Sequence, residues 1–216
     1  MFTDKTILAI SPHTDDVELA CGGAIAELTA HGSRVYYVGL SDCQDTLINT
    51  RFPIDQLAKE CRSALRILGV KNKDISIFQH QNKFFCQDPK QIFKTLEKLR
   101  DSIQPDLVLI PDVNQTHQDH KVVAEQAISV FRRKTSMLSY EQPWNDLQFT
   151  PDFFIQISAK SLSLKMKAIK TYKTQVAFKR GYLSKEFIYG LAAVRGVQIN
   201  VQYAEGFKVV KFIEKL

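Results

Sequence analysis

Short apolar runs and amphipathic segments alternate along the chain from its start to about residue 140. The apolar runs are bounded by residues that favour turns, and their continuous hydrophobicity predicts strands buried on both faces, at residues 6–11, 34–41, 74–79 and 106–111. Between and after these runs, apolar residues recur at intervals of three and four positions, which predicts helices over residues 17–28, 57–68, 92–99 and 120–131.

Capping and breaking residues mark the ends of several of these helices. Gly69 follows the second periodic segment and is a natural stop signal. Asp88 and Pro89 supply an N-cap and a first-turn proline for the third helix, and the fourth should begin near Thr116. Strand and helix therefore alternate regularly, which predicts a parallel, three-layer α/β sheet with right-handed crossovers.

The rhythm loosens beyond about Tyr140. We expect a strand at residues 152–158, a helix at residues 162–172 and a last strand at residues 207–213 that completes the sheet. Repeats, low-complexity tracts and linkers are absent from the sequence, so it predicts a single domain over residues 1–216.

Composition narrows the classes of protein that the chain can represent. Hydrophobic residues make up 44% and charged residues 24%, as in globular proteins, and no apolar run is long enough for a membrane span. Because no signal-peptide core opens the chain, we expect a cytoplasmic protein. The net charge of +6 is spread out and no aromatic-plus-basic motif accompanies it, so we expect no nucleic-acid partner.

The four cysteines lie far apart and form no Cys-x-x-Cys pair. This spacing argues against a thiolate zinc site and against a disulfide framework. Cys21 and Cys61 fall on the apolar faces of predicted helices, so we expect both to be buried thiols.

Two clusters of histidine and aspartate follow predicted strands. His13, Asp15 and Asp16 come after the first strand, and His117 and His120 come after the fourth. Ligands bind at the carboxyl ends of parallel strands, and histidine with carboxylate suits Zn²⁺ or a similar divalent ion. The two clusters are therefore interpreted as two halves of one metal site.

A hydrolytic metal site needs about three protein ligands and a general base that does not bind the metal. His13 and Asp16 are three positions apart and can face one centre, whereas Asp15 between them is left free to accept a proton from water. One imidazole of the second cluster would complete the ligand set. His117 and His120 lie one helical turn apart, so either could bind the metal while the other faces the substrate.

A structural alternative explains each cluster separately. Asp15 and Asp16 can cap the first helix, and Thr116 with Asp119 matches a capping box at the start of the fourth. Two clusters at strand ends that hold three of the five histidines favour the metal site. The Gly22–Gly23 pair inside the first helix indicates a close backbone approach there, and the dinucleotide-binding pattern Gly-x-Gly-x-x-Gly is absent from the sequence.

At these positions the chain resembles the PIG-L/LmbE family of metal-dependent N-deacetylases. The family's motifs stand here as Pro-His-Thr-Asp-Asp at residues 12–16 and His-Gln-Asp-His at residues 117–120. The likeness extends through Cys-Gly-Gly at residues 21–23 and through residues 64–70 and 203–207, and so covers nearly the whole chain. The resemblance implies an LmbE-like fold, a three-layer Rossmann-like sandwich with a mostly parallel sheet.

The resemblance also implies a role for each residue of the two motifs. It implies that Zn²⁺, or Fe²⁺ or another divalent metal, is bound by three ligands, His13, Asp16 and His120. It makes Asp15 the general base, and His117 the group that stabilises the oxyanion or protonates the departing amine. Asp119 would accept an imidazole N–H and hold a histidine in one tautomer.

The substrate region departs from the family pattern. Arg51 stands where members often carry an Arg-Gly-Thr stretch that contacts the substrate, but Phe52 and Pro53 follow it here. Residues 43–50 would form either a mobile loop over the site or a plain surface loop.

The function that follows is zinc-dependent removal of an acetyl group from an N-acetylated amino sugar or its conjugate. The alternative is a catalytically inactive sugar- or nucleotide-binding protein on the same fold. Aromatic residues between positions 178 and 189, if exposed, could form the interface of a homo-oligomer.

Overall fold

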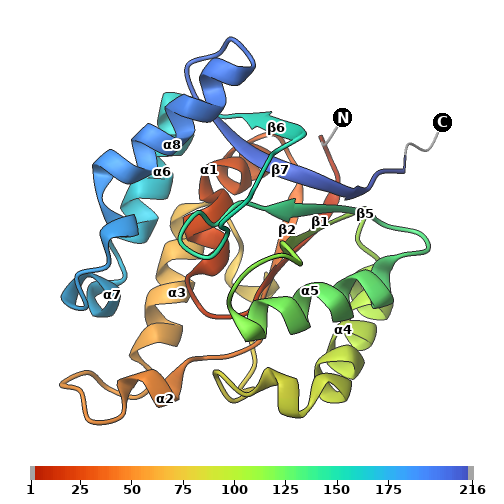
Figure 1. The fold of residues 1–216 in the computed structure, drawn as a ribbon, viewed down its shortest axis with the longest axis vertical. Coiled ribbons are helices and arrows are strands. Elements are labelled where there is room, and N and C mark those ends of the chain that lie inside the picture. The colour runs from red at the N-terminus through yellow and green to blue at the C-terminus, as the bar shows by residue number, and fades with distance from the viewer. Residues whose placement is uncertain (1–2, 214–216) are drawn as a thin grey trace.

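The computed structural model describes residues 3–213. Within them, one sheet of seven strands has the order β3-β2-β1-β4-β5-β7-β6 (Figure 1). Five strands run parallel to one another: β1 (Thr6–Ser11), β2 (Arg34–Gly39), β3 (Ile75–Ile77), β4 (Leu107–Pro111) and β5 (Ser136–Tyr140). The remaining pairings are antiparallel, between β7 (Ala204–Lys211) and its two neighbours, β5 and β6 (Phe153–Gln156). The mostly parallel sheet confirms the predicted fold class.

Helices cover both faces of the sheet, which gives three layers (Figure 1). One face carries α1 (Asp16–Ala30), α3 (Gln56–Ile67), α6 (Ala159–Ile169) and α8 (Lys185–Gln198), and the other carries α4 (Pro89–Ile103) and α5 (Gln118–Phe131). Side chains of β1 alternate between the two cores, with Ile7 and Ala9 on the α1 side and Leu8 and Ile10 on the α5 side. Shorter helices connect these elements: α2 (Gln44–Leu47), α7 (Lys173–Ala177) and 3-10 turns at Asn72–Asp74, Phe85–Gln87 and Gly181–Leu183.

Several predicted helix ends are confirmed. After α3, Gly69 has a φ of +91° and the Val70 N–H donates to the Leu65 carbonyl at 3.0 Å, as in a Schellman motif. The Asp88 carboxylate accepts from the backbone N–H of Gln91 at 3.1 Å, directly before Pro89 at the start of α4.

The backbone at Gly22 and Gly23 is closely approached, as predicted, and the approaching groups are side chains. Helix α1 is kinked at Cys21, and the Glu205 carboxylate of β7 accepts from the backbone N–H groups of Gly23 and Ala24 at 3.0 and 2.6 Å. A Cβ on Gly23 would stand 3.0 Å from that carboxylate and 2.7 Å from a methyl group of Ile157. Glycine lets the second half of α1 receive this cap.

The sequence did not predict β5 or α8. Strand β5 is buried throughout but contains Ser136 and Ser139, which interrupt the apolar run by which a buried strand is recognised. The aromatic residues expected to be exposed are partly buried within the protein: Phe178 packs on the α1–α3 core, and Tyr182, Phe187 and Tyr189 pack around α8. These four rings are therefore only partly exposed, and the homo-oligomer interface stays a prediction.

All four cysteines are free, and Cys21 and Cys61 are buried as predicted. None of the helices among residues 3–213 is long and apolar enough to cross a membrane. The domain predicted over residues 1–216 includes residues 1–2 and 214–216, which lie outside the described residues.

Candidate active site

The two histidine–aspartate clusters meet at the carboxyl edge of the sheet. His13, Asp15 and Asp16 follow β1, while His117 and His120 follow β4, and these strands are neighbours at the point where the strand order reverses. All five side chains line one cavity of about 1000 Å³. The convergence expected from the sequence is therefore present in the structure.

Three ligand-type atoms at the floor of this cavity form a nearly equilateral triangle. The His13 Nδ1 atom lies 3.2 Å from Asp16 Oδ2 and 3.2 Å from His120 Nε2, and the last two atoms are 3.3 Å apart. Ligands at about 2.0–2.1 Å around a tetrahedral zinc ion lie about 3.3–3.4 Å from one another. The spacing and chemistry of these atoms therefore fit a tetrahedral divalent cation.

Hydrogen bonds on the far sides of both imidazoles fix their tautomers. His13 Nε2 donates to Asp119 Oδ2 at 3.0 Å, and His120 Nδ1 donates to the side-chain carbonyl of Gln115. Each ring therefore turns its other nitrogen toward the triangle. Asp119 also accepts from the backbone N–H groups of Lys83 and Phe85 at 2.6 and 3.2 Å, so a third loop, after β3, supports the same centre.

The electrostatics of the triangle favour an anionic Asp16. Burial raises the pKa of Asp16, but the charges and hydrogen bonds of His120 and His13 outweigh burial and hold this pKa well below its usual value. For His13 burial acts in the opposite direction and lowers the pKa. Hydrogen bonds to Asp119 and Asp16 outweigh burial and raise this pKa well above its usual value. A proton and a cation therefore compete for the Nδ1 atom of His13.

Asp15 differs from Asp16 although the two are adjacent. Its carboxylate makes no hydrogen bond or ion pair with another residue among those described, and as the N-cap residue of α1 it makes no side-chain cap. Burial, followed by the negative charge of Asp16, raises the pKa of Asp15 to about 7. The alternative that Asp15 caps α1 with its side chain is therefore wrong, and its carboxylate can exchange a proton near neutral pH.

His117 is the N-cap residue of α5, and its Nδ1 atom accepts the backbone N–H of Asp119 at 3.2 Å. The capping box of the structural alternative does not form, because Asp119 turns to His13 and the Thr116 hydroxyl donates to the Asn145 carbonyl. Burial, followed by the charges of His13 and His120, lowers the pKa of His117 to about 4. A neutral ring that accepts at Nδ1 carries its proton on Nε2, so His117 offers a hydrogen-bond donor.

A second ligand set of three imidazoles is also available. One ring nitrogen from each of His13, His117 and His120 lies within 4.8 Å of the others. Asp16 makes the tighter set, because its oxygen lies 3.2–3.3 Å from the two imidazole nitrogens and no proton has to leave it. The proton on His117 Nε2 opposes metal binding at that nitrogen.

The rest of the cavity wall contains residues that the sequence did not indicate. Trp144, after β5, stacks on Tyr182 with 4.6 Å between ring centroids and 22° between planes. Arg180 lines the same wall, and its charge acts on Asp15. Common residue types in irregular segments gave no signal by which sequence reasoning could have placed them here.

Arg51 lies apart from this wall. It is exposed, its guanidinium stands 5.3 Å from the centre of the Phe52 ring, and it is not among the residues that line the cavity. By contrast, the loop at residues 43–50 does reach the site, because Cys43, Asp45, Thr46 and Ile48 line the cavity.

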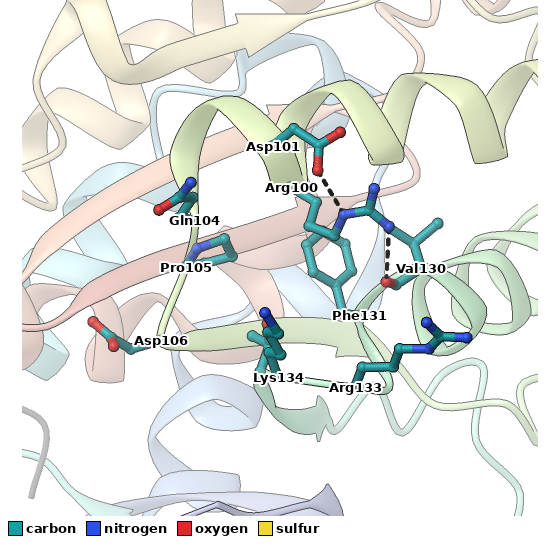
Figure 2. Close-up of a pocket in the computed structure, with 10 residues that line it drawn as sticks. Arg100, Asp101, Gln104, Pro105, Asp106, Val130, Phe131, Arg133 and Lys134 are labelled. Atoms are coloured by element: carbon teal, nitrogen blue, oxygen red, sulfur yellow. Dashed lines mark hydrogen bonds and ion pairs between the residues drawn. The ribbon is translucent and has the colours of Figure 1, made fainter. Parts of the chain in front are cut away.

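A second cavity, of about 690 Å³, opens between the C-terminal ends of α4 and α5 (Figure 2). Its Arg100 side chain is engaged by Asp101 at 2.8 Å and by the Val130 carbonyl at 3.4 Å. Asp106 and Thr135 directly precede β4 and β5, which places this cavity at the amino edge of the sheet. It contains none of the predicted site residues and lies at the end of the sheet where ligands are not expected.

The chain matches a known protein family over most of its first two thirds. The family model described as PIG-L, GlcNAc-PI de-N-acetylase, matches residues 8–131, which is more than half of the chain and includes both histidine–aspartate motifs.

Two curated relatives cover most of the chain. The uncharacterized deacetylase YaiS of Escherichia coli (strain K12) is 29% identical over 175 residues, which are 79% of this chain and 91% of the relative. The diacetylchitobiose deacetylase of Thermococcus kodakarensis is 27% identical over 229 residues, which cover 95% of this chain and 83% of the relative.

Among solved structures, GalB from Pseudomonas putida KT2440, a 4-carboxy-2-hydroxymuconate hydratase, has a TM-score of 0.79 at 23% identity. The match covers 98% of this chain and 99% of that one. At this identity the likeness shows the fold alone. Because the same fold carries a hydratase, the activity has to be argued from the residues of the site.

Proposed function

The chain belongs to the PIG-L family of de-N-acetylases, and from this premise we propose that it hydrolyses the acetamido group of an N-acetylated amino sugar or its conjugate. One observation carries the proposal: a triangle of ligand atoms that fits a divalent cation stands beside a carboxylate that is not part of the triangle. A hydrolase needs both parts, whereas a binding protein has no chemical need for the second.

We propose His13, Asp16 and His120 as the ligands and Zn²⁺ as the ion, with Fe²⁺ as the other candidate at such a donor set. When bound, the cation would make a water molecule more acidic and polarise the amide carbonyl. Asp119 and Gln115 would hold the imidazoles of His13 and His120 with the correct nitrogen facing inward.

Asp15 and His117 perform the proton chemistry in this proposal. Asp15 accepts a proton from water as the water oxygen attacks the amide carbon. The Nε2–H group of His117 donates a hydrogen bond to the carbonyl oxygen as negative charge develops there, and keeps its proton. When the C–N bond breaks, Asp15 returns the proton to the amine nitrogen. Acetic acid and a free amine are the products, and Asp15 is again a carboxylate.

This assignment predicts the pH dependence of activity. The raised pKa of Asp15 means that its basic form is lost as pH falls, so kcat/KM should decline on the acid side of neutrality. A bound cation would shift the decline to lower pH, because positive charge favours the carboxylate. The measurement is kcat/KM from pH 5 to 8 at saturating metal. An activity that increases steadily toward pH 5 would contradict a carboxylate base.

The stacked rings predict where the sugar binds. Trp144 and Tyr182 present an aromatic wall to the cavity, and an aromatic face suits the apolar face of a pyranose ring. We expect Trp144→Ala to raise KM for an active N-acetyl sugar about 10-fold or more while kcat changes less than threefold. Leu147→Ala serves as the control, since Leu147 is 86% exposed near the same loop and does not line the cavity. An unchanged KM in Trp144→Ala would exclude this wall as the sugar site.

The function itself is tested by incubating metal-reconstituted protein with a panel of N-acetyl amino sugars and conjugates. We expect release of acetate and of a free amine in equal amounts from at least one of them, and loss of that activity with a chelator. Metal and sugar binding without acetate release from any member would favour the catalytically inactive alternative.

A further inference from the structure

Two glutamines contact two of the proposed metal ligands from opposite sides. Gln115, after β4, accepts the Nδ1–H of His120 with its side-chain carbonyl. Gln142, after β5, donates its side-chain amide to Asp16 Oδ1 at 2.8 Å. Both glutamines are fully buried, so neither can exchange these partners for solvent.

Both glutamines are held by the same oxygen of one residue, Asp146. Its Oδ2 atom accepts the side-chain amide of Gln115 at 3.3 Å and the backbone N–H of Gln142 at 2.8 Å. Asp146 is only 9% exposed, and it lies on the loop that follows β5. It touches no proposed ligand directly. A single glutamine lies between it and each of two ligands, Gln115 before His120 and Gln142 before Asp16.

A carboxylate at Asp146 fixes the orientation of the Gln115 side-chain amide. Burial, followed by the charge of Asp112, raises the pKa of Asp146 to about 6, so Asp146 is mainly an acceptor-only carboxylate at neutral pH. The NH₂ group of Gln115 must then face Asp146, and its carbonyl must face His120. His120 is thereby obliged to carry its proton on Nδ1 and to keep Nε2 free for a cation.

We propose that Asp146 is a positioning residue for the metal centre, which sets the tautomer of His120 through Gln115 and the place of Asp16 through Gln142. The inference rests on the proposed metal site but not on the proposed reaction. It predicts that a residue without contact to ligand, cation or substrate controls metal affinity.

Cobalt titration of the apoprotein tests this, because the visible absorption of Co²⁺ reports both affinity and coordination geometry. We expect Asp146→Ala to weaken Co²⁺ binding about 10- to 100-fold, the range for loss of outer hydrogen-bond partners. Asp146→Asn should stay within about threefold of the parent, because its single carbonyl oxygen can still accept from both glutamines. Asp146→Leu separates the acceptor from simple space filling, because leucine fills the site but accepts no hydrogen bond; we expect it to weaken Co²⁺ binding as Asp146→Ala does, whereas a role by volume alone would leave its affinity near that of the parent.

Asp74→Ala is the matched control. Asp74 is equally a buried carboxylate, 4% exposed, but it pairs with Arg34 at the start of β2, at the opposite edge of the sheet. We expect this variant to lower the melting temperature of the apoprotein without changing Co²⁺ affinity.

A double-mutant cycle shows whether Asp146 acts through Gln115. Gln115→Met alone should weaken Co²⁺ binding. The double variant should lose much less affinity than the product of the two single losses. Gln115→Met also keeps the inference testable if Asp146→Ala fails to fold. Unchanged affinity in Gln115→Met, or in folded Asp146→Ala, would overturn the inference.

The same titration separates this inference from the proposed function. If the parent protein binds Co²⁺ and Asp146→Ala binds it weakly, the inference stands even where no N-acetyl sugar is hydrolysed. If the parent binds no Co²⁺, the proposed metal site and this inference both fall.

Discussion

Asp15→Asn is expected to lower kcat by about 100- to 10,000-fold, the usual contribution of a positioned general base. The amide has nearly the shape of the carboxylate but cannot accept a proton from water at any working pH. Metal affinity should change less than about threefold, because Asp15 contributes no atom to the ligand triangle. The measurement pairs single-turnover rates with metal content of the same preparation.

Asp45→Asn is the control for this experiment. Asp45 also lines the cavity but is exposed on the loop that contains α2, so its charge should be dispensable for proton transfer. We expect its kcat to stay within about fivefold of the parent. An Asp15→Asn variant with full activity would remove Asp15 as the base, and one that lost metal together with activity would make Asp15 a ligand.

Much of the site could be predicted because its chemistry is local. His13, Asp15 and Asp16 lie within four positions at the end of a continuous apolar run, and the same holds for His117, Asp119 and His120 after the fourth strand. Alternation of strands and helices places such ends at one edge of a parallel sheet. The pattern alone therefore indicated that the two motifs could meet.

Local patterns could not choose between a capping box and a metal site. Thr116 and Asp119 satisfy the capping pattern, but in the structure Asp119 binds His13, which is 106 positions away in the sequence. This contact depends on β1 and β4 being neighbours in the sheet, and no window of sequence around Thr116 contains that information.

The supporting residues were missed for a related reason. Gln142 reaches Asp16 across 126 positions, and Asp146 follows β5, a strand whose serines hid it from periodicity. Glutamine and aspartate in an irregular segment are ordinary surface residues until the position of β5 beside β4 is known. Arg51 was suggested by the family pattern alone. It is not among the residues that line the cavity, and its role in substrate binding stays a prediction.

Substitution of single ligands by alanine distinguishes the two possible ligand sets, one with Asp16 and one with three imidazoles. His13 and His120 belong to both, so their removal abolishes metal binding in either case and decides nothing. Asp16→Ala and His117→Ala give opposite results for the two sets. With Asp16 as ligand, we expect Asp16→Ala to weaken metal binding at least about 100-fold, since each ligand carries a share of the binding free energy.

His117→Ala should instead retain the metal and lower kcat about 100- to 1,000-fold, as expected for the loss of one hydrogen-bond donor to an oxyanion. The physical basis is the Asp119 N–H, which occupies His117 Nδ1 and leaves the ring proton on Nε2, where a donor is useful and a metal ligand is not available. Isothermal titration of both apoproteins with Zn²⁺, beside steady-state kinetics at saturating metal, measures the two effects. Retention of metal by Asp16→Ala together with its loss from His117→Ala would establish the three-imidazole set and would leave the oxyanion without the donor proposed for it.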